Sequence, residues 1–558
     1  MALKIQGNVV LDFDGAGYSS TNIAVGIDAL ESNTTGQYNA AVGQAALFTN
    51  TTGGYNTAVG VNALFSNTIG TQNIAVGHAA LYSNTTGNYN TAVGMYALYS
   101  TTIGTSLIAV GINALYSNTT GIDNTAVGFQ ALYSNTTGIR NQAFGVSALT
   151  TNTIGSYSIA IGYSALANST TGSYNVAVGH NALLNNTTGE YNIAVGAFAL
   201  DASSTTVYNV AMGHQALSTL TSGDYNTALG SLSQRSNATG IRNTTVGYAS
   251  MYAALGSYNV AVGFGAMYSS GASNNNVAVG YQALYSNTTG ANNVAVGYAA
   301  LTTNTIGEST VAVGHQSLNN NTTGYYNTAV GFQSMFYNTT GYNNTSHGWR
   351  SLFYNTTGFN NVAVGQQSLY ANTTGTYNTA VGGSALYNNT TGTINTAFGY
   401  YAGLNITTGS NNTLLGYNAQ PSSATVSNEI TLGDANITNL RCADTTISTL
   451  SDARDKTNIE NIPVGLDFIK AVRPVMFDWN TRDGSRKGRK DFGFIAQELD
   501  LVEQQFGTSA HTRLVHKENP DMWEADPMKM FPIMVKALQE AAEKIEMLEQ
   551  RIMQLENK

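Results

Sequence analysis

A glycine recurs at a fixed 17-residue period through most of this chain, and this period constrains the fold more than any other feature. It closes a motif similar to Ala-Val-Gly, and 25 glycines share the phase from Gly26 to Gly433, with one 16-residue step between Gly247 and Gly263. Self-similarity at a fixed period is typical of stacked solenoids. The sequence therefore predicts a repeat array over residues 21–433.

The repeat unit indicates strands and turns. A typical unit contains Asn-Thr-Ala-Val-Gly at residues 56–60, Ala-Leu-Phe-Ser at 63–66 and Asn-Thr-Ile-Gly at 67–70. Its segments between Gly and the Asn-Thr-Thr-Gly turn are too short for helices of about ten residues. Thr, Val and Tyr favour strands, and no proline precedes Pro421. We therefore expect a mostly β protein, a parallel β-roll or β-solenoid of 17-residue coils.

The charge distribution divides the chain. Residues 1–450 hold six basic and twelve acidic residues, whereas the segment 451–558 holds 16 and 19. We expect a cap or attachment segment at 1–20, the solenoid at 21–433, a connector at 434–450 and a small α+β domain at 451–558.

Composition excludes several classes of protein. The chain is 42% hydrophobic and 9% charged, which does not fit disorder, and its net charge of −9 gives no basic footprint for nucleic acid. It has one cysteine, no run of 18 apolar residues and no signal-peptide core at its start. We expect no disulfide within the chain, no membrane insertion, no metal and no cofactor.

Two features of the repeat predict how it is stabilised. So short a coil gives a thin core, and strand alternation sends some apolar side chains to the opposite face, so we expect several rolls to pack together. Asparagines at two fixed phases, exemplified by Asn50, Asn67 and Asn84 and by Asn39 and Asn56, should stack as amide ladders.

The Asn-x-Ala-Val-Gly…Ala-Leu…Asn-Thr-Thr-Gly unit resembles the head repeats of trimeric autotransporter adhesins, which form left-handed parallel β-rolls as trimers. The resemblance covers residues 21–433, with a period longer than the usual head repeat. It implies a fibrous homotrimer.

The C-terminal region carries a more specific set of motifs. Residues 451–459 read Ser-Asp-Ala-Arg-Asp-Lys-Thr-Asn-Ile, and Leu466–Ile469, Arg473–Trp479 and Gly493–Glu498 follow. This order closely resembles the C-terminal intramolecular chaperone domain of phage endosialidase tailspikes, L-shaped phage fibres and myelin regulatory factors. The resemblance implies a domain that trimerises, helps an upstream β-rich fibre to fold and then cuts itself off in front of a serine.

The same resemblance implies a Ser/Lys dyad at Ser451 and Lys456 and a cleaved bond between Leu450 and Ser451. The Ser451 hydroxyl would attack the carbonyl of Leu450, Lys456 would take the proton, and water would hydrolyse the ester. A lysine acts as a base only where desolvation lowers its pKa. Residues five apart lie about 140° apart on a helix, so we expect the dyad on a turn or across chains. The spacing alone has no weight, and we expect no activity on an external substrate.

Four further residues match the family pattern and are interpreted either as hydrogen-bonding support or as members of surface salt bridges. They are Asp452, Arg454, Asn458 and Glu498.

The C-terminal segment has apolar residues at alternating steps of three and four, which predicts about three heptads of coiled coil. They are Leu538, Ala541, Ile545, Leu548, Ile552 and Leu555. Such a helix could instead pack on its own domain. Ile at a and Leu at d favours dimers in isolated zippers, so the trimer rests on the resemblance.

An aromatic stripe follows the repeat glycine in the later coils. It comprises Tyr248, Phe264, Tyr281, Tyr298, Phe332 and Trp349, with His315 in the same phase. Such a stripe could bind glycan by stacking, or it could pack at a trimer seam or decorate the outside.

Together these features predict a homotrimeric viral fibre, a phage tail fibre or tail-associated adhesin. We expect it to be made in the host cytoplasm and built into the virion, with its N-terminus joined to other tail proteins. Its receptor would be a glycan or protein of the host surface. A bacterial cell-surface trimeric adhesin is the alternative, and an ice-binding solenoid is less favoured because adjacent threonines point to opposite sides.

Overall fold

The computed structural model describes residues 2–5, 9–12, 22–253, 255–437, 441, 454, 456–480, 487–517 and 523–557. The chain divides into two compact units, Met1–Phe359 and Asn360–Lys558. This division falls inside the repeat, so the domain boundaries drawn from the sequence stay predictions. Each unit is described by itself.

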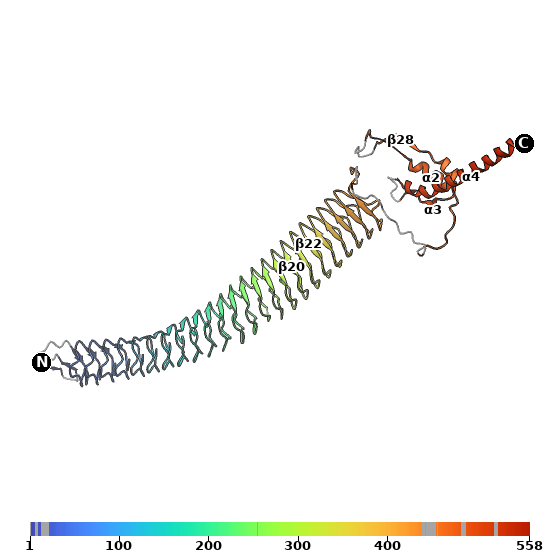
Figure 1. The fold of residues 1–558 in the computed structure, drawn as a ribbon. Helices are drawn as coiled ribbons and strands as arrows, with labels where there is room; N and C mark the ends of the chain where they lie inside the picture. The colour runs from blue at the N-terminus through green and yellow to red at the C-terminus, as the bar shows by residue number, and fades with distance from the viewer. Residues whose placement is uncertain are drawn as a thin grey trace. The chain divides into compact units, whose positions relative to one another are not determined.

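The first unit is a parallel β-solenoid with one three-residue strand in each coil (Figure 1). Its strands are β3 (Ile23–Val25), β4 (Ala40–Val42), β5 (Thr57–Val59), β6 (Ile74–Val76), β7 (Thr91–Val93), β8 (Ile108–Val110), β9 (Thr125–Val127), β10 (Gln142–Phe144), β11 (Ile159–Ile161), β12 (Val176–Val178), β13 (Ile193–Val195), β14 (Val210–Met212), β15 (Thr227–Leu229), β16 (Thr244–Val246), β17 (Val260–Val262), β18 (Val277–Val279), β19 (Val294–Val296), β20 (Val311–Val313), β21 (Thr328–Val330) and β22 (Thr345–His347).

The register follows the sequence period. Thr57 pairs with Ile74, its equivalent in the next coil, and Thr244 pairs with Val260 across the one shortened step. Equivalent side chains therefore lie above one another along the array. The predicted fold, a mostly β solenoid of 17-residue coils, is confirmed.

The repeat glycine is required by the closeness of the coils. Gly60 has φ 135°, and a Cβ there would lie 2.4 Å from the carbonyl oxygen of Gly77. Any other side chain would push the two backbones apart, which explains why this position is glycine in every coil.

Small apolar side chains fill the inside of each coil. Ala58, Ala63 and Leu64 are fully buried, and the same pattern repeats along the unit. Leu64 and Asn62 adopt left-handed backbone conformations with φ of 53° and 57°. Such conformations are uncommon outside glycine, and here the inter-coil ladders hold them in place.

Both predicted amide ladders are present. Asn67 Nδ2 donates to Asn50 Oδ1 at 2.8 Å and to the Gly70 carbonyl at 3.0 Å. In the second ladder the Asn56 backbone N–H donates to Asn39 Oδ1 at 3.0 Å, and Asn56 Nδ2 reaches the same Gly70 carbonyl at 2.9 Å. The two ladders thus converge on the turn and satisfy backbone groups inside the coil.

One group of coils has a polar core that the sequence pattern did not reveal. Gln234 occupies a leucine position and is fully buried, and its Nε2 donates to Thr245 Oγ1 at 3.0 Å. Ser233 bonds to Thr245 Oγ1 at 2.5 Å and to Ser250 Oγ at 3.0 Å. These groups satisfy one another, which removes most of the cost of burying them.

The first residues form a hairpin at the start of the array. β1 (Ala2–Ile5) pairs antiparallel with β2 (Val9–Asp12), and β2 pairs antiparallel with β3. This covers the backbone edge of the first coil, as a cap would.

The second unit begins with further coils of the same period and continues as a small α+β domain. Its solenoid strands are β23 (Val362–Val364), β24 (Thr379–Val381), β25 (Thr396–Phe398), β26 (Thr413–Leu415) and β27 (Ile430–Leu432). The α+β part comprises α1 (Leu466–Ala471), β28 (Val475–Asp478), β29 (Lys490–Gly493), α2 (Ala496–Gln505), α3 (Ser509–Thr512), β30 (Val515–His516), β31 (Glu524–Ala525), the 3-10 turn η2 (Pro527–Met530) and α4 (Phe531–Glu556). Its core contains Phe468, Leu499, Leu514, Met530 and Ile533.

We predict that Asn135→Ala destabilises the solenoid by about 3 kcal/mol, since buried hydrogen-bonding groups left without a partner cost about 1–3 kcal/mol each. Asn135 Nδ2 donates to Asn118 Oδ1 and the Gly138 carbonyl, and its Oδ1 accepts from Asn152. Denaturant unfolding and hydrogen exchange of these coils measure the change. Thr137→Ala, an exposed position of the same turn, is the control and should change stability by less than about 0.5 kcal/mol. Equal effects would contradict the ladder's role.

Candidate assembly face and autoprocessing site

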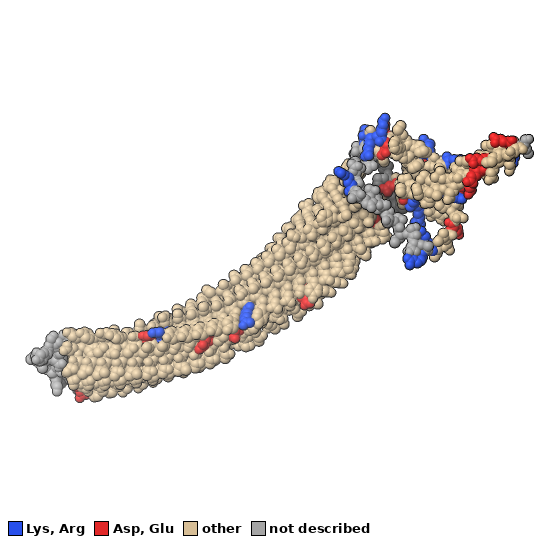
Figure 2. All heavy atoms as spheres, in the orientation of Figure 1, with Lys and Arg blue, Asp and Glu red and all other residues tan. Residues whose placement is uncertain are grey.

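The strands of the first unit present an apolar face to solvent, as the sequence predicted for a single chain. The middle residue of each strand points inward, so Ala58 is fully buried while Val59 is 38% exposed. Ile74 and Val110 occupy the same face at 44% and 36%. None of the strands β3–β22 contains Lys, Arg, Asp or Glu. The visible surface of the coils carries few charged side chains (Figure 2). A long apolar face of this kind is typical of an interaction surface.

The aromatic stripe forms a continuous ladder. Successive rings from Tyr248 to Phe332, including His315, stack with centroids 5.0–5.3 Å apart and interplanar angles of 6–16°. Arg350 lies 5.1 Å from the Trp349 ring. Within the ladder each ring face is covered by a neighbouring ring, so the edges face solvent. Glycan binding by this stripe stays a prediction. Because the rings stack on one another, few ring faces are free for a sugar to stack on.

Part of the predicted autoprocessing site lies outside the described residues. Leu450, Ser451 and Asp452 are not among the described residues. Arg454 and Lys456 are exposed in the described part. The Ser/Lys dyad therefore stays a prediction.

Asn458 and Glu498 also match the family pattern. Asn458 is exposed with a left-handed φ of 57°. Glu498, in the first turn of α2, accepts from Arg473 Nε at 2.9 Å and from its second guanidinium nitrogen. These hydrogen bonds from Arg473 lower the pKa of Glu498. The pair joins α2 to the segment that leads into β28, and whether it supports the cleavage site stays a prediction.

Two buried acidic residues, not singled out in the sequence, brace the α+β domain. Glu503 is 2% exposed and accepts from the Leu514 backbone N–H at 2.7 Å and from the Thr512 hydroxyl. Asp500 pairs with Lys517 and accepts from Gln504 Nε2 at 2.7 Å. They fix α2 against α3 and β30, so their role is structural. In the sequence, the only signal of this structural role is the position of the two acids on α2.

α4 has two parts with different surroundings. Near its start Ile533 and Ala537 are buried, and Glu540 Oε2 accepts from the Leu466 backbone N–H at 2.7 Å, which caps α1. The predicted heptad leucines and isoleucines beyond residue 537 are instead 53–70% exposed. The helix therefore packs on its own domain only at its start, and its heptad seam is open to a partner helix.

Two classes of site are absent from the described part of the chain. There, no helix has the length and apolarity to cross a membrane, and no three or more His, Cys, Asp or Glu are grouped to hold a metal ion.

Comparison with known proteins gives a family match in the C-terminal region. The family described as chaperone of endosialidase, which is classed as a peptidase, matches residues 451–508. No curated protein matches the chain. The match supports a C-terminal chaperone domain and implies autoproteolysis, and it begins at Ser451, the first residue after the predicted cut.

We predict that Arg473→Gln reduces the acid sensitivity of the α+β domain. Because Arg473 lowers the pKa of Glu498 in the folded chain, the stability from this pair is present above the ordinary glutamate pKa and is lost as pH falls through the folded value. Denaturant unfolding is followed by tryptophan fluorescence in a Trp349→Phe background, which leaves Trp479 and Trp523 as reporters. Lys470→Gln, from another exposed ion pair with Asp467, serves as control. An unchanged pH profile in Arg473→Gln would contradict the prediction.

Proposed function

We propose that this chain is a subunit of a homotrimeric fibre, a phage tail fibre or tail-associated adhesin, that attaches the virion to a host surface. Its C-terminal domain drives trimerisation and folding and then removes itself between Leu450 and Ser451. The observation that carries the proposal is the endosialidase-chaperone match placed directly after a β-solenoid. The N-terminal segment would join other tail proteins, and the fibre would be made in the host cytoplasm and built into the virion.

Two exposed apolar surfaces support self-association. The strand face of the solenoid and the heptad seam of α4 are both open in a single chain. Burying apolar surface stabilises by about 25 cal/mol per Å², so faces repeated over many coils favour association. The number three comes from the family resemblance.

The proposed cleavage is an acyl shift followed by hydrolysis. Ser451 Oγ bonds to the carbonyl carbon of Leu450, the peptide C–N bond breaks, and Lys456 moves the hydroxyl proton to the leaving amine. Water then splits the ester to give a C-terminal Leu450 carboxylate and a free Ser451. Lys456 is exposed in the single chain, so the desolvation that a lysine base needs would come from assembly. The cut would then follow completed trimerisation.

The repeat itself favours one second candidate. Its resemblance to adhesin heads fits a bacterial cell-surface trimeric adhesin, with the same solenoid and a different means of display.

We predict that the expressed chain splits between Leu450 and Ser451 and that Ser451→Ala stays intact, because the attacking hydroxyl is lost. Lys456→Met should also stay intact. Mass spectrometry of the purified products gives the cut position to the residue. Thr457→Ala, next to the proposed base, is the control and should cleave. Cleavage of Ser451→Ala at the same bond would refute the serine's role.

We predict that Val93→Lys with Val110→Lys disrupts the trimer, since charges buried in an apolar interface without partners are costly. Both valines are 36% exposed on the strand face. Light scattering after size exclusion, in a Ser451→Ala background, should show loss of the species with three times the chain mass. Thr120→Lys with Thr137→Lys adds the same charges at exposed turn positions and should remain trimeric. Trimers in both variants would exclude this face as the interface.

A further inference from the structure

A second aromatic ladder runs along the first unit at the residue two before each strand. Neighbouring rings lie 4.9–5.1 Å apart with interplanar angles of 3–5°. Each tyrosine is 37–53% exposed. The rings are Tyr157, Tyr174, Tyr191, Tyr208 and Tyr225. Because the ring faces cover one another, the ladder presents hydroxyl-bearing edges along the array.

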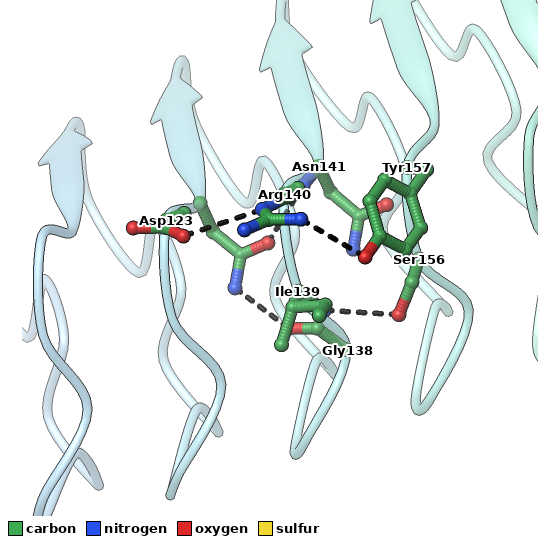
Figure 3. Close-up of polar contacts among 8 residues, drawn as sticks. Asp123, Gly138, Ile139, Arg140, Asn141, Ser156 and Tyr157 are labelled. Atoms are coloured by element: carbon green, nitrogen blue, oxygen red, sulfur yellow. Dashed lines mark hydrogen bonds and ion pairs between the residues drawn. The ribbon is translucent and has the colours of Figure 1, made fainter.

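An arginine lies at each end of this ladder, and the first one has an acidic partner. The Arg140 guanidinium lies 5.5 Å from the Tyr157 ring centroid and donates to Tyr157 Oη at 3.1 Å. Its Nε is 3.5 Å from Asp123 Oδ2 (Figure 3). The charge of Arg140 is therefore matched within the chain.

The second arginine has no carboxylate partner among the residues that the structure describes. Arg242 lies between Tyr225 and Tyr258, 5.7 Å and 5.6 Å from their ring centroids, and donates to Tyr258 Oη at 3.2 Å. The position 17 residues earlier, in the preceding coil, is Asp123 for Arg140 and Tyr225 for Arg242. The nearby Asp224 accepts from the Val207 backbone N–H at 2.8 Å, in the preceding coil.

The same coil holds another arginine in a similar setting. Arg235 lies 5.6 Å from the Tyr252 ring centroid and donates to the Tyr252 hydroxyl. Across the described coils it forms no ion pair either, and Asp201 occupies the same phase two coils earlier. The only 16-residue step of the repeat, Gly247 to Gly263, follows this coil. Two arginines that form no ion pair among the described residues thus lie in one coil, each stacked on a tyrosine ring.

We propose that the tyrosine ladder and the arginines of this coil bind a linear polysaccharide that carries acidic groups. A guanidinium stacked on rings presents its N–H edge outward, and that edge matches a carboxylate or sulfate with two parallel hydrogen bonds. Stacking also fixes the side chain in advance, which lowers the entropy lost on binding. The row of tyrosine hydroxyls hydrogen-bonds the sugar hydroxyls along the array. This inference rests on the proposed attachment function and names the receptor chemistry.

The test measures binding of the trimeric protein to immobilised polygalacturonate, with dextran sulfate as a second acid and neutral dextran as the uncharged polymer. We expect both acidic polymers to bind, in a salt-dependent manner, and neutral dextran not to bind. Arg242→Gln should weaken binding about tenfold, the scale of one charge-assisted contact, and Arg235→Gln with Arg242→Gln should abolish it. Arg140→Gln is the matched control, because its guanidinium is already paired with Asp123, and it should bind as the wild type does.

Three outcomes overturn the inference. They are no preference of the wild type for acidic over neutral polymer, equal losses in Arg140→Gln and Arg242→Gln, or a loss of trimer mass in Arg242→Gln without any polymer binding. The last outcome would mean that Arg242 contacts a second copy of the chain in the trimer and does not bind polysaccharide. Arg242→Lys, which keeps the charge and loses the planar fork, separates recognition from misfolding. Trimer mass and the Leu450–Ser451 cut, measured on the same preparation, report on the proposed function independently.

Discussion

The structure depends on the close approach of two backbones at one glycine in every coil. A Cβ at Gly60 would lie 2.4 Å from the Gly77 carbonyl oxygen, so the coils reach hydrogen-bonding distance only where the side chain is absent. Once they do, each position of the repeat stands above its equivalent in the neighbouring coil. A single sequence choice is therefore repeated as a line of amides, rings or apolar groups. The amide ladders, the aromatic ladders and the apolar strand face all follow from this geometry.

How much of this could be predicted depended on whether a feature repeats. The period gave the coils, the strand at Ala58 and the amide ladder through Asn67, because regular positions show their environment in the pattern. The left-handed backbone at Leu64 and the buried Gln234 could not be predicted, since both depend on tertiary contacts that override local preference. The ion pair of Glu498 with Arg473 joins two residues far apart in the sequence, and spacing does not encode that contact. The chaperone domain was predictable from its ordered motifs and not from any periodicity.

Regularity also creates a problem, because identical coils do not distinguish the correct neighbour from the next one. Departures from the repeat supply that distinction. Gln234 Nε2 donates to Thr245 Oγ1 in the next coil, and a slip by one coil would remove this partner at a cost of about 1–3 kcal/mol. Leu107 replaces an asparagine of the second ladder and still donates its backbone N–H to Asn90 Oδ1. Such coils fix the register within a chain, while register among chains requires a separate domain, which is the part proposed for residues 451–558.

The uneven charge makes sense if that separate domain is temporary. The segment beyond Leu450 holds 16 of the 22 basic and 19 of the 31 acidic residues, so the proposed cut would remove most of the charge. What stays is a solenoid stabilised by hydrogen bonds and small apolar contacts, whose stability depends little on salt. Few basic residues remain in this part of the chain, so the environment of each arginine can be compared. In the first unit all of them, Arg140, Arg235, Arg242 and Arg350, lie on aromatic rings, and only Arg140 pairs with an acid among the described residues. Arg235 and Arg242 form no ion pair among the described residues, and the proposed partner would supply the negative charge that they lack.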